Sequence, residues 1–245
     1  MESVTDLYTC STKIMQSDMD FSLNLINLNR RHCIALASAL AMAGNNRAIA
    51  AVQSGSLRQR DNKILVVGDS LSAEYGLRRG SGWVALLEKK LIDEKMAATV
   101  INASISGDTT SGGRQRLPPL LAQHLPTLVV IELGGNDALR GLPLDMTQKN
   151  LSNMAQAAKK AGANVLLLGM QVPPNYGRDY GKRFAEVFAE VERANKVALV
   201  PFFLEGIADV PDSLKWFQAD RIHPVEAAHP LILANVWPAI KKALS

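Results

Sequence analysis

Cysteine is nearly absent from this chain of 245 residues, which has only Cys10 and Cys33. Disulfides, zinc clusters built on cysteine and cysteine nucleophiles are therefore excluded after residue 33. Aromatic residues make up only 5 % of the sequence. No apolar run reaches the roughly 20 residues of a transmembrane helix. The chain also has no large excess of either charge: 27 basic and 23 acidic residues give a net charge of +4. The basic residues are scattered, which argues against nucleic acid as a partner.

The bulk composition is that of a globular protein. Hydrophobic residues make up 47 % and charged residues 20 % of the chain, close to the average for soluble domains. A chain of this length can bury a full hydrophobic core without stabilisation by disulfides or bound metal ions. No internal repeat, low-complexity tract or second domain is evident.

The N-terminal region has the three parts of a secretory signal peptide. Basic residues 30–31 precede an apolar run over residues 33–43, which ends in Ala-Met-Ala before Gly44. A leader counted from Met1 is long, so we expect the true start near Met19. The alternative is an amphipathic or buried N-terminal helix. We therefore predict a signal peptide over 1–43, a flexible lead-in over 44–61 and one domain over 62–245. Export from the cytoplasm, to a periplasm or the medium, follows from this prediction.

Short apolar runs alternate with helical stretches along the expected domain. Strands are expected over residues 64–67, 98–102, 127–133, 164–170 and 198–201. Helices are expected over residues 83–95, 111–124, 145–161, 178–196 and 225–244. We expect prolines 118 and 119 to interrupt or start the second helix, Asp145 to cap the third, and prolines 230 and 238 to break the last. This alternation predicts a parallel sheet covered on both faces, a doubly wound α/β/α sandwich of about five strands.

The residues that follow the strands are unusual. Ligands of open α/β sheets bind outside the carboxyl ends of the strands. Four loops at that edge carry candidate site residues, which are Ser70, Gly107, Asn136 and the pair Asp220 and His223. Each has an ordinary alternative on its own, as a helix cap, a turn residue or a loop histidine. Their joint occurrence is much harder to explain in that way.

These residue types suit acyl transfer. A serine hydroxyl needs an adjacent base, a histidine takes and returns a proton near neutral pH, and an aspartate fixes the histidine tautomer. Ser70 is the candidate nucleophile, His223 the base and Asp220 its orienting partner. The backbone N–H groups of Ser70 and Gly107 and the side-chain amide of Asn136 are candidate oxyanion donors.

Rival motifs are missing from the sequence. There is no G-x-S-x-G elbow, no phosphate-binding loop and no dinucleotide fingerprint. With four histidines in the whole chain, we expect neither a metal site nor a cofactor. His229 is the other base candidate, and His124 at a helix end complements the helix dipole.

Residues 62–244 resemble the SGNH (GDSL) hydrolases, and within them the bacterial periplasmic esterases of the thioesterase, lysophospholipase and arylesterase type. The blocks that carry the resemblance are VVGDSLSAEYGL (66–77), INASISGDTTSGG (101–113), IELGGNDALRG (131–141) and DRIHP (220–224). The resemblance implies a flavodoxin-like sandwich. It also implies a Ser70–His223–Asp220 triad and an oxyanion hole formed by Ser70, Gly107 and Asn136.

The resemblance further implies a monomeric serine esterase that takes small acyl esters or thioesters, needs no cofactor and inserts into no membrane once the leader is removed. Five residues are weaker candidates for substrate contact: Asp69, Leu139, Leu142, Pro173 and Arg221. Arg221 departs from the family pattern, which has glycine there, and we expect it to reshape the entrance or contact an anionic leaving group. Two alternatives stay open: a carbohydrate acetylesterase of the same fold, and a flavodoxin-like binding module without a reactive serine.

Overall fold

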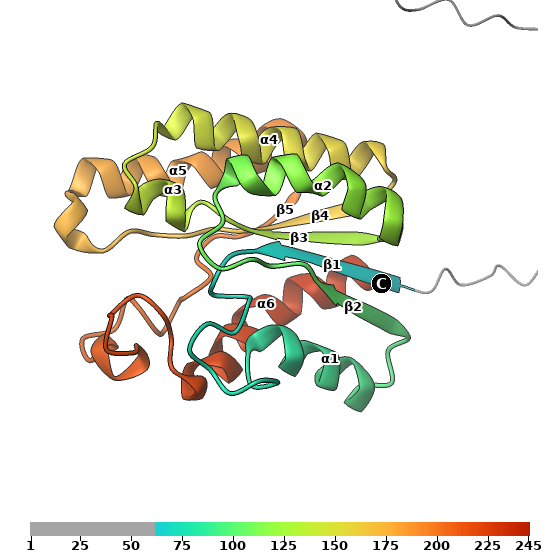
Figure 1. Ribbon diagram of the computed structural model, residues 1–245, viewed down its shortest axis with the longest axis horizontal. Helices are drawn as coiled ribbons and strands as arrows, with labels where there is room; N and C mark the ends of the chain where they lie inside the picture. Colours follow the sequence, from blue (N-terminus) through green and yellow to red (C-terminus); the bar gives the residue numbers. More distant parts are fainter. Residues whose placement is uncertain (1–61) are drawn as a thin grey trace, which may run out of the picture. The chain divides into compact units, whose positions relative to one another are not determined.

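The computed structural model describes residues 62–245 (Figure 1). The expected leader and lead-in lie outside the described residues. Within the described part of the chain, five parallel strands form one sheet in the order β2-β1-β3-β4-β5. Their bounds are β1 Asn62–Gly68, β2 Ala98–Asn102, β3 Leu128–Glu132, β4 Asn164–Leu168 and β5 Ala198–Val200. The predicted doubly wound α/β fold is confirmed.

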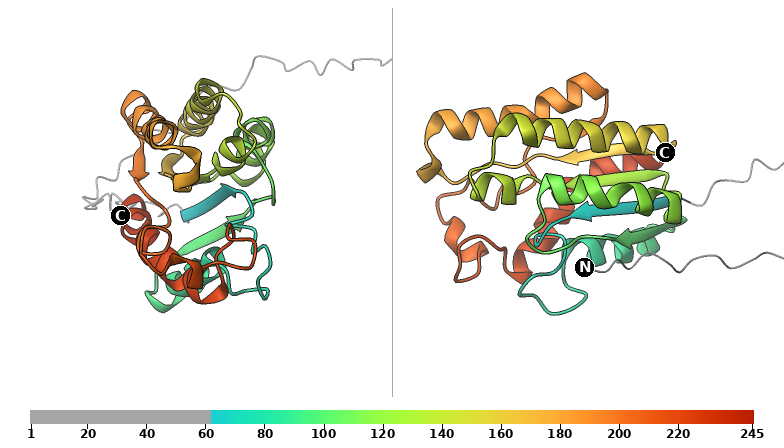
Figure 2. Two further views of the ribbon diagram at one scale, coloured as in Figure 1. Left: turned by 90° about the vertical axis from the view of Figure 1, so that its left-hand side faces the viewer. Right: turned by 45° about the horizontal axis from the view of Figure 1, so that its top comes forward.

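Residues 62–245 form six α-helices. They are α1 Trp83–Asp93, α2 Thr110–His124, α3 Gly135–Leu139, α4 Leu144–Lys160, α5 Arg178–Asn195 and α6 His229–Leu244. Figures 1 and 2 show α2, α4 and α5 on one face and α1 and α6 on the other. Among the helices of residues 62–245, none combines the length and apolar character needed to cross a bilayer.

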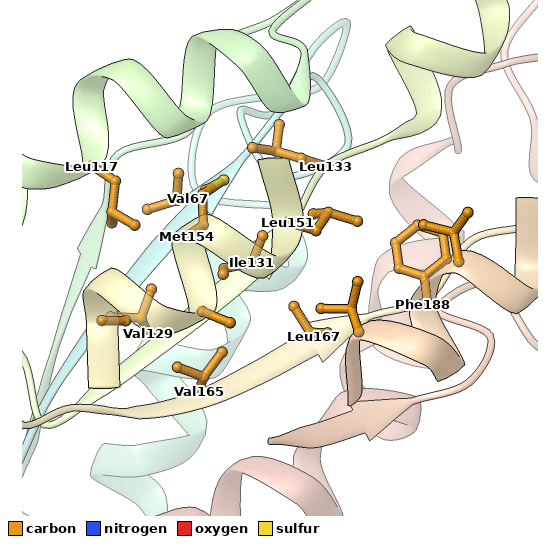
Figure 3. Packing of buried hydrophobic residues seen from close by; sticks show 14 of the residues in the cluster. Val67, Leu117, Val129, Ile131, Leu133, Leu151, Met154, Val165, Leu167 and Phe188 are labelled. Atoms are coloured by element: carbon orange, nitrogen blue, oxygen red, sulfur yellow. The ribbon is translucent and has the colours of Figure 1, made fainter. Parts of the chain in front are cut away.

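The strand residues alternate between two hydrophobic cores, as expected for a sheet buried on both faces. Leu65 and Val67 of β1 pack toward α2, α4 and α5, whereas Ile64 and Val66 pack toward α1 and α6. Figure 3 shows the first core, where Met154 and Leu151 of α4 lie over β3 and Phe188 closes one end. This continuous burial holds the strand ends, and therefore the loops after them, in fixed positions.

Prolines and caps differ from the prediction in three helices. Pro118 and Pro119 lie inside α2 without ending it. The carbonyls that lose their helical donors belong to exposed Arg114 and Gln115 and can bind water. Pro230 lies in the first turn of α6, where no amide donor is needed, and Pro238 lies inside that helix.

The expectation of an Asp145 cap was also wrong. The cap position of α4 is occupied by Pro143, and Asp145 lies in the first turn. An acidic side chain there still complements the positive end of the helix dipole.

His229 has a structural position instead of a catalytic one. It is 1 % exposed at the start of α6. Its Nδ1 accepts a hydrogen bond of 3.0 Å from the backbone N–H of Trp83, the first residue of α1. Burial lowers the pKa of His229 to about 4, against the opposing charges of Glu74 and Glu226.

We predict that this histidine makes the protein less stable in mild acid. The unfolded chain binds a proton at His229 below about pH 6.5, whereas the folded chain binds it only near pH 4. The stability that neutral His229 contributes is therefore lost as the pH is lowered from about 6.5 to about 4. The free energy of unfolding of the wild type minus that of His229→Gln should decrease by about 3 kcal/mol between pH 7 and pH 4. Urea titrations of both proteins at each pH measure this difference. A constant difference would show that His229 is not held neutral.

Candidate active site

The candidate site lies at the carboxyl edge of the sheet, where the strand order reverses between β1 and β3. Open α/β sheets bind ligands at such a switch point. Ser70 follows the end of β1 by two residues, and Asn136 lies in the short helix α3 that follows β3. Gly107 and His223 come from the loops after β2 and β5. The topology therefore brings the four predicted loops to one place.

Ser70, His223 and Asp220 form a continuous hydrogen-bonded chain. The Ser70 Oγ lies 2.9 Å from His223 Nε2. The His223 Nδ1 lies 2.7 Å from Asp220 Oδ2. These distances are those of a nucleophile within reach of its base, and of a base oriented by a carboxylate.

The turn over residues 220–223 fixes both members of the Asp-His pair. Asp220 Oδ1 accepts the backbone N–H groups of Ile222 and His223 at 2.9 and 3.0 Å. Partial burial raises the pKa of Asp220. The hydrogen bonds from His223 and Ile222 outweigh that effect and lower it to about 2. Asp220 is therefore ionised at neutral pH.

Tyr75 and Gln218 support His223 from outside this hydrogen-bonded chain of three residues. The Tyr75 ring lies over the His223 ring at 4.2 Å between centroids. Gln218 Nε2 donates to the backbone carbonyls of Tyr75 and Pro224 at 2.9 and 3.1 Å. This side chain thus ties the loop that follows Ser70 to the loop that carries His223.

The three predicted oxyanion donors have different local surroundings. Among residues 62–245, no acceptor engages the backbone N–H groups of Ser70 and Gly107. Gly107 has φ of +78°, a left-handed conformation that glycine adopts without strain. One N–H of the Asn136 amide donates to Asp69 Oδ2 at 2.9 Å. Its second N–H remains for an oxyanion.

A buried polar network anchors α3, the helix that carries Asn136. The Asp137 carboxylate, 0 % exposed, accepts the backbone N–H of Thr110 at 2.8 Å and also the Thr110 hydroxyl. Thr147 and Asn150 of α4 complete the network. Asn136 is thereby held against both α2 and α4.

Arginines fix the loop that carries Gly107. Arg116 pairs with Asp108 at 2.7 Å and donates to the carbonyls of Gly68 and Ala103 at the ends of β1 and β2. Arg140 Nη2 donates to the Gly107 carbonyl at 2.7 Å. The loop is thus bound from both sides.

Two buried carboxyl groups lie behind Ser70. The Asp69 backbone N–H donates to Glu132 Oε2 at 3.2 Å, and the Ser72 hydroxyl donates to the same oxygen at 2.7 Å. Burial raises the pKa of Asp69 to about 6, although hydrogen bonds from Leu71 and Asn136 oppose it. Burial, followed by the charge of Asp69, raises the pKa of Glu132 well above its usual range.

The five weaker candidates lie in several places. Asp69 is buried behind Ser70. Leu139 ends α3 with an exposed side chain, and Leu142 is half-buried in the loop after it. Pro173 lines a hollow of about 370 Å³ beside the start of α5. Arg221 is exposed next to the Asp-His pair. Ser70 and His223 do not line that hollow.

Sequence reasoning missed several residues that position the site, namely Glu132, Asp137, Arg116, Tyr75 and Gln218. Two of them carried a detectable sign. Glu132 is a charged residue in an otherwise apolar strand, and Asp137 directly follows Asn136. Buried charges of this kind are retained only where they have partners. Nothing in the sequence pairs Tyr75 with His223, because that contact depends on the path of two separate loops.

Comparison with known proteins gives consistent matches. Residues 66–231 match the GDSL-like Lipase/Acylhydrolase family. Esterase TesA of Pseudomonas aeruginosa is 56 % identical over 181 residues, 74 % of this chain and 89 % of the relative. The arylesterase of Vibrio mimicus is 44 % identical, over 76 % of this chain and 92 % of its own length. Thioesterase 1/protease 1/lysophospholipase L1 of Escherichia coli is 43 % identical, over 69 % of this chain and 78 % of its own length. A crystal structure of TesA superimposes with a TM-score of 0.71, at 55 % identity, covering 74 % of this chain and 99 % of that one.

Proposed function

The chain belongs to the GDSL-like lipase/acylhydrolase family and is an ester hydrolase, and we propose that Ser70 is its nucleophile. The observation that carries this assignment is the chain of hydrogen bonds from Ser70 Oγ through His223 to Asp220. In this mechanism His223 Nε2 takes the proton from Ser70 as its Oγ attacks the acyl carbonyl carbon. Asp220 keeps the second ring nitrogen protonated and stabilises the imidazolium.

The tetrahedral intermediate then places its oxyanion against the N–H groups of Ser70, Gly107 and Asn136. His223 returns the proton to the leaving alcohol or thiol, and an acyl-Ser70 forms. A water molecule, deprotonated by His223, attacks this ester and releases the acid with free Ser70. Every proton in this cycle passes through one imidazole, so the cycle uses neither a metal nor a cofactor.

We assign acyl esters and thioesters as the substrate class. The exposed side chains of Leu139, Ile105 and Ile222 belong to the segments that carry Asn136, Gly107 and His223, and they suit an apolar acyl chain. Leu142 lies in the loop after α3, and Pro173 lies in a different connection, the one that follows β4. Asp69, being buried, supports the site from behind instead of contacting substrate.

Hydrolysis of p-nitrophenyl esters with acyl chains of two to sixteen carbons tests this assignment. We expect medium or long chains to be preferred. An optimum at acetate, with activity on acetylated sugars, would favour the carbohydrate acetylesterase. No hydrolysis at any length would favour the binding module.

We also propose that the chain is exported after cleavage between Ala43 and Gly44. The basic, apolar and small-residue parts of residues 30–43 support this proposal. The protein recovered from the periplasm or medium of an expressing bacterium should have an intact mass that begins at Gly44. A mass that includes residues 1–43 would contradict it.

Arg221 offers a prediction on specificity. It has φ of +61° between Asp220 and His223, a conformation that costs a non-glycine residue about 1 kcal/mol. We expect Arg221→Gly to stabilise the protein by up to about 1 kcal/mol and to lower kcat/KM for anionic esters only. Equal kinetics of both proteins on an anionic and a neutral ester would remove Arg221 from the binding site.

A further inference from the structure

Glu132 is a fully buried acid that the mechanism above leaves unused. Glu132 ends β3 and is 0 % exposed. Its Oε2 accepts two hydrogen bonds, from the Asp69 backbone N–H and from the Ser72 hydroxyl. The Ser72 oxygen in turn accepts the indole N–H of Trp83 at 3.0 Å. Glu132 therefore fixes Asp69 and Ser72, the residues on either side of the pair formed by the nucleophile Ser70 and Leu71.

The space for this carboxyl group is created by Gly68. A Cβ atom at residue 68 would lie 2.6 Å from Glu132 Oε2 and 2.8 Å from the Ser72 hydroxyl oxygen. Contacts this short do not occur, so a side chain at residue 68 would displace the acid. The glycine at the end of β1 thus permits the close approach of Glu132 to the nucleophile turn.

The second oxygen of Glu132 shows which form of the acid is present. Oε1 is buried and has no hydrogen-bond partner among the described residues, so an ionised Glu132 would leave a charged oxygen buried without a donor. The charge of the neighbouring Asp69 disfavours a second carboxylate at this place as well. A proton on Oε1 removes the buried charge, and the Asp69 carboxylate is the neighbouring group that can accept it.

Asp69 connects Glu132 to the oxyanion hole. Its Oδ1 accepts the Leu71 N–H at 3.0 Å, and its Oδ2 accepts one N–H of Asn136 at 2.9 Å. The other charges that act on Asp69 are His223, which favours its ionised form, and Asp108, which opposes it. Asp108 is paired with Arg116. An ionised Asp69 can accept from Asn136 and from Glu132 together.

We propose that Glu132 is a positioning residue that acts as a neutral carboxylic acid, holding the Ser70 turn and, through Asp69, the oxyanion amide of Asn136. This inference rests on the proposed function of Ser70. A buried acid kept neutral also avoids placing a second negative charge beneath the oxyanion.

Substitutions at Glu132 test the proposal. The amide of Glu132→Gln donates to Asp69 and accepts from Asp69 N–H and Ser72, as the neutral acid does, so kcat should change by less than about threefold. The acid limb of the kcat/KM profile should not move, because no charge is lost. Glu132→Leu breaks every one of these bonds, and we expect kcat to fall by about a hundredfold at nearly constant KM.

Asn195→Ala is the matched control. Asn195 is also buried and hydrogen bonded, to Ser152 and Gln156 of α4, and it contacts no residue of the site. It should lower thermal stability but leave kcat per active site unchanged. Unchanged kcat in Glu132→Leu, or an acid limb shifted to lower pH in Glu132→Gln, would overturn the proposal.

Infrared spectroscopy provides a test that does not depend on activity. The wild type at neutral pH should show the carbonyl stretch of a protonated carboxylic acid, and Glu132→Gln should lose it. A wild type without this band would overturn the proposal even if Glu132→Leu fails to fold. Ser70→Ala, assayed alongside, separates the two claims: activity in that variant would refute the proposed nucleophile, whereas the band reports on Glu132 alone.

Discussion

Ser70→Ala is expected to lower kcat for ester hydrolysis by about 10⁶-fold, the scale seen when the nucleophile of a serine hydrolase is removed. The physical reason is that His223 Nε2, 2.9 Å from Ser70 Oγ, then has no hydroxyl to deprotonate. The oxyanion donors and the substrate contacts remain, so a small rate above that of water should persist. End-point assays with p-nitrophenyl esters at high enzyme concentration measure this residual rate.

Ser106→Ala is the matched control, because Ser106 is an exposed serine in the loop of Gly107. It should retain activity close to that of the wild type. Loss of activity in Ser106→Ala with retention in Ser70→Ala would show that the nucleophile has been assigned to the wrong loop.

Asp220→Asn should produce the second largest effect, a fall in kcat of about 10⁴-fold. The asparagine can still accept the N–H groups of Ile222 and His223 that Asp220 accepts. Its NH₂ group, however, faces His223 Nδ1 and donates to it, which moves the ring proton to Nε2. That tautomer cannot take the proton of Ser70.

The control for this variant is Asp212→Asn, an exposed aspartate eight residues earlier in the same connection, which should change kcat little. Because the pKa of Asp220 is about 2, the wild-type carboxylate stays ionised throughout an assay near neutral pH. An Asp220→Asn variant with nearly wild-type kcat would mean that His223 is oriented by the turn alone.

Local features that repeat along the chain were predictable from sequence. The apolar strands and their alternation with helices predicted the layers, and β2 has the predicted bounds. The residues after four of the five strands predicted the edge at which the candidate site lies, since parallel strands place their carboxyl ends together. His223 lies within hydrogen-bonding distance of both Ser70 and Asp220.

Features that depend on long-range partners were not predictable. The five-residue helix α3 is too short to show a periodic pattern. It is held in place by a hydrogen bond from Thr110 to its own Asp137, two residues that lie 27 positions apart in the sequence. His229 read as a possible base, and only the contact with Trp83 shows that it caps α1. Prolines 118 and 119 do not end α2, because the carbonyls that they leave without donors belong to exposed residues and can bind water.

The role of Glu132 belongs to the same class. Its partners Asp69 and Ser72 lie 63 and 60 residues away, in the turn that follows β1, the strand that pairs with β3. A lone glutamate in a strand indicates that some partner exists, but only the pairing of β1 with β3 identifies it.

The most direct measurement is to inactivate the protein with a p-nitrophenyl alkylphosphonate and locate the adduct by peptide mass spectrometry. A phosphonate traps the attacking oxygen and stands in for the tetrahedral intermediate. We predict one adduct per chain, on the peptide that contains Ser70, formed slowly or not at all in His223→Ala. Stoichiometric inactivation with the adduct on any other residue would contradict the account.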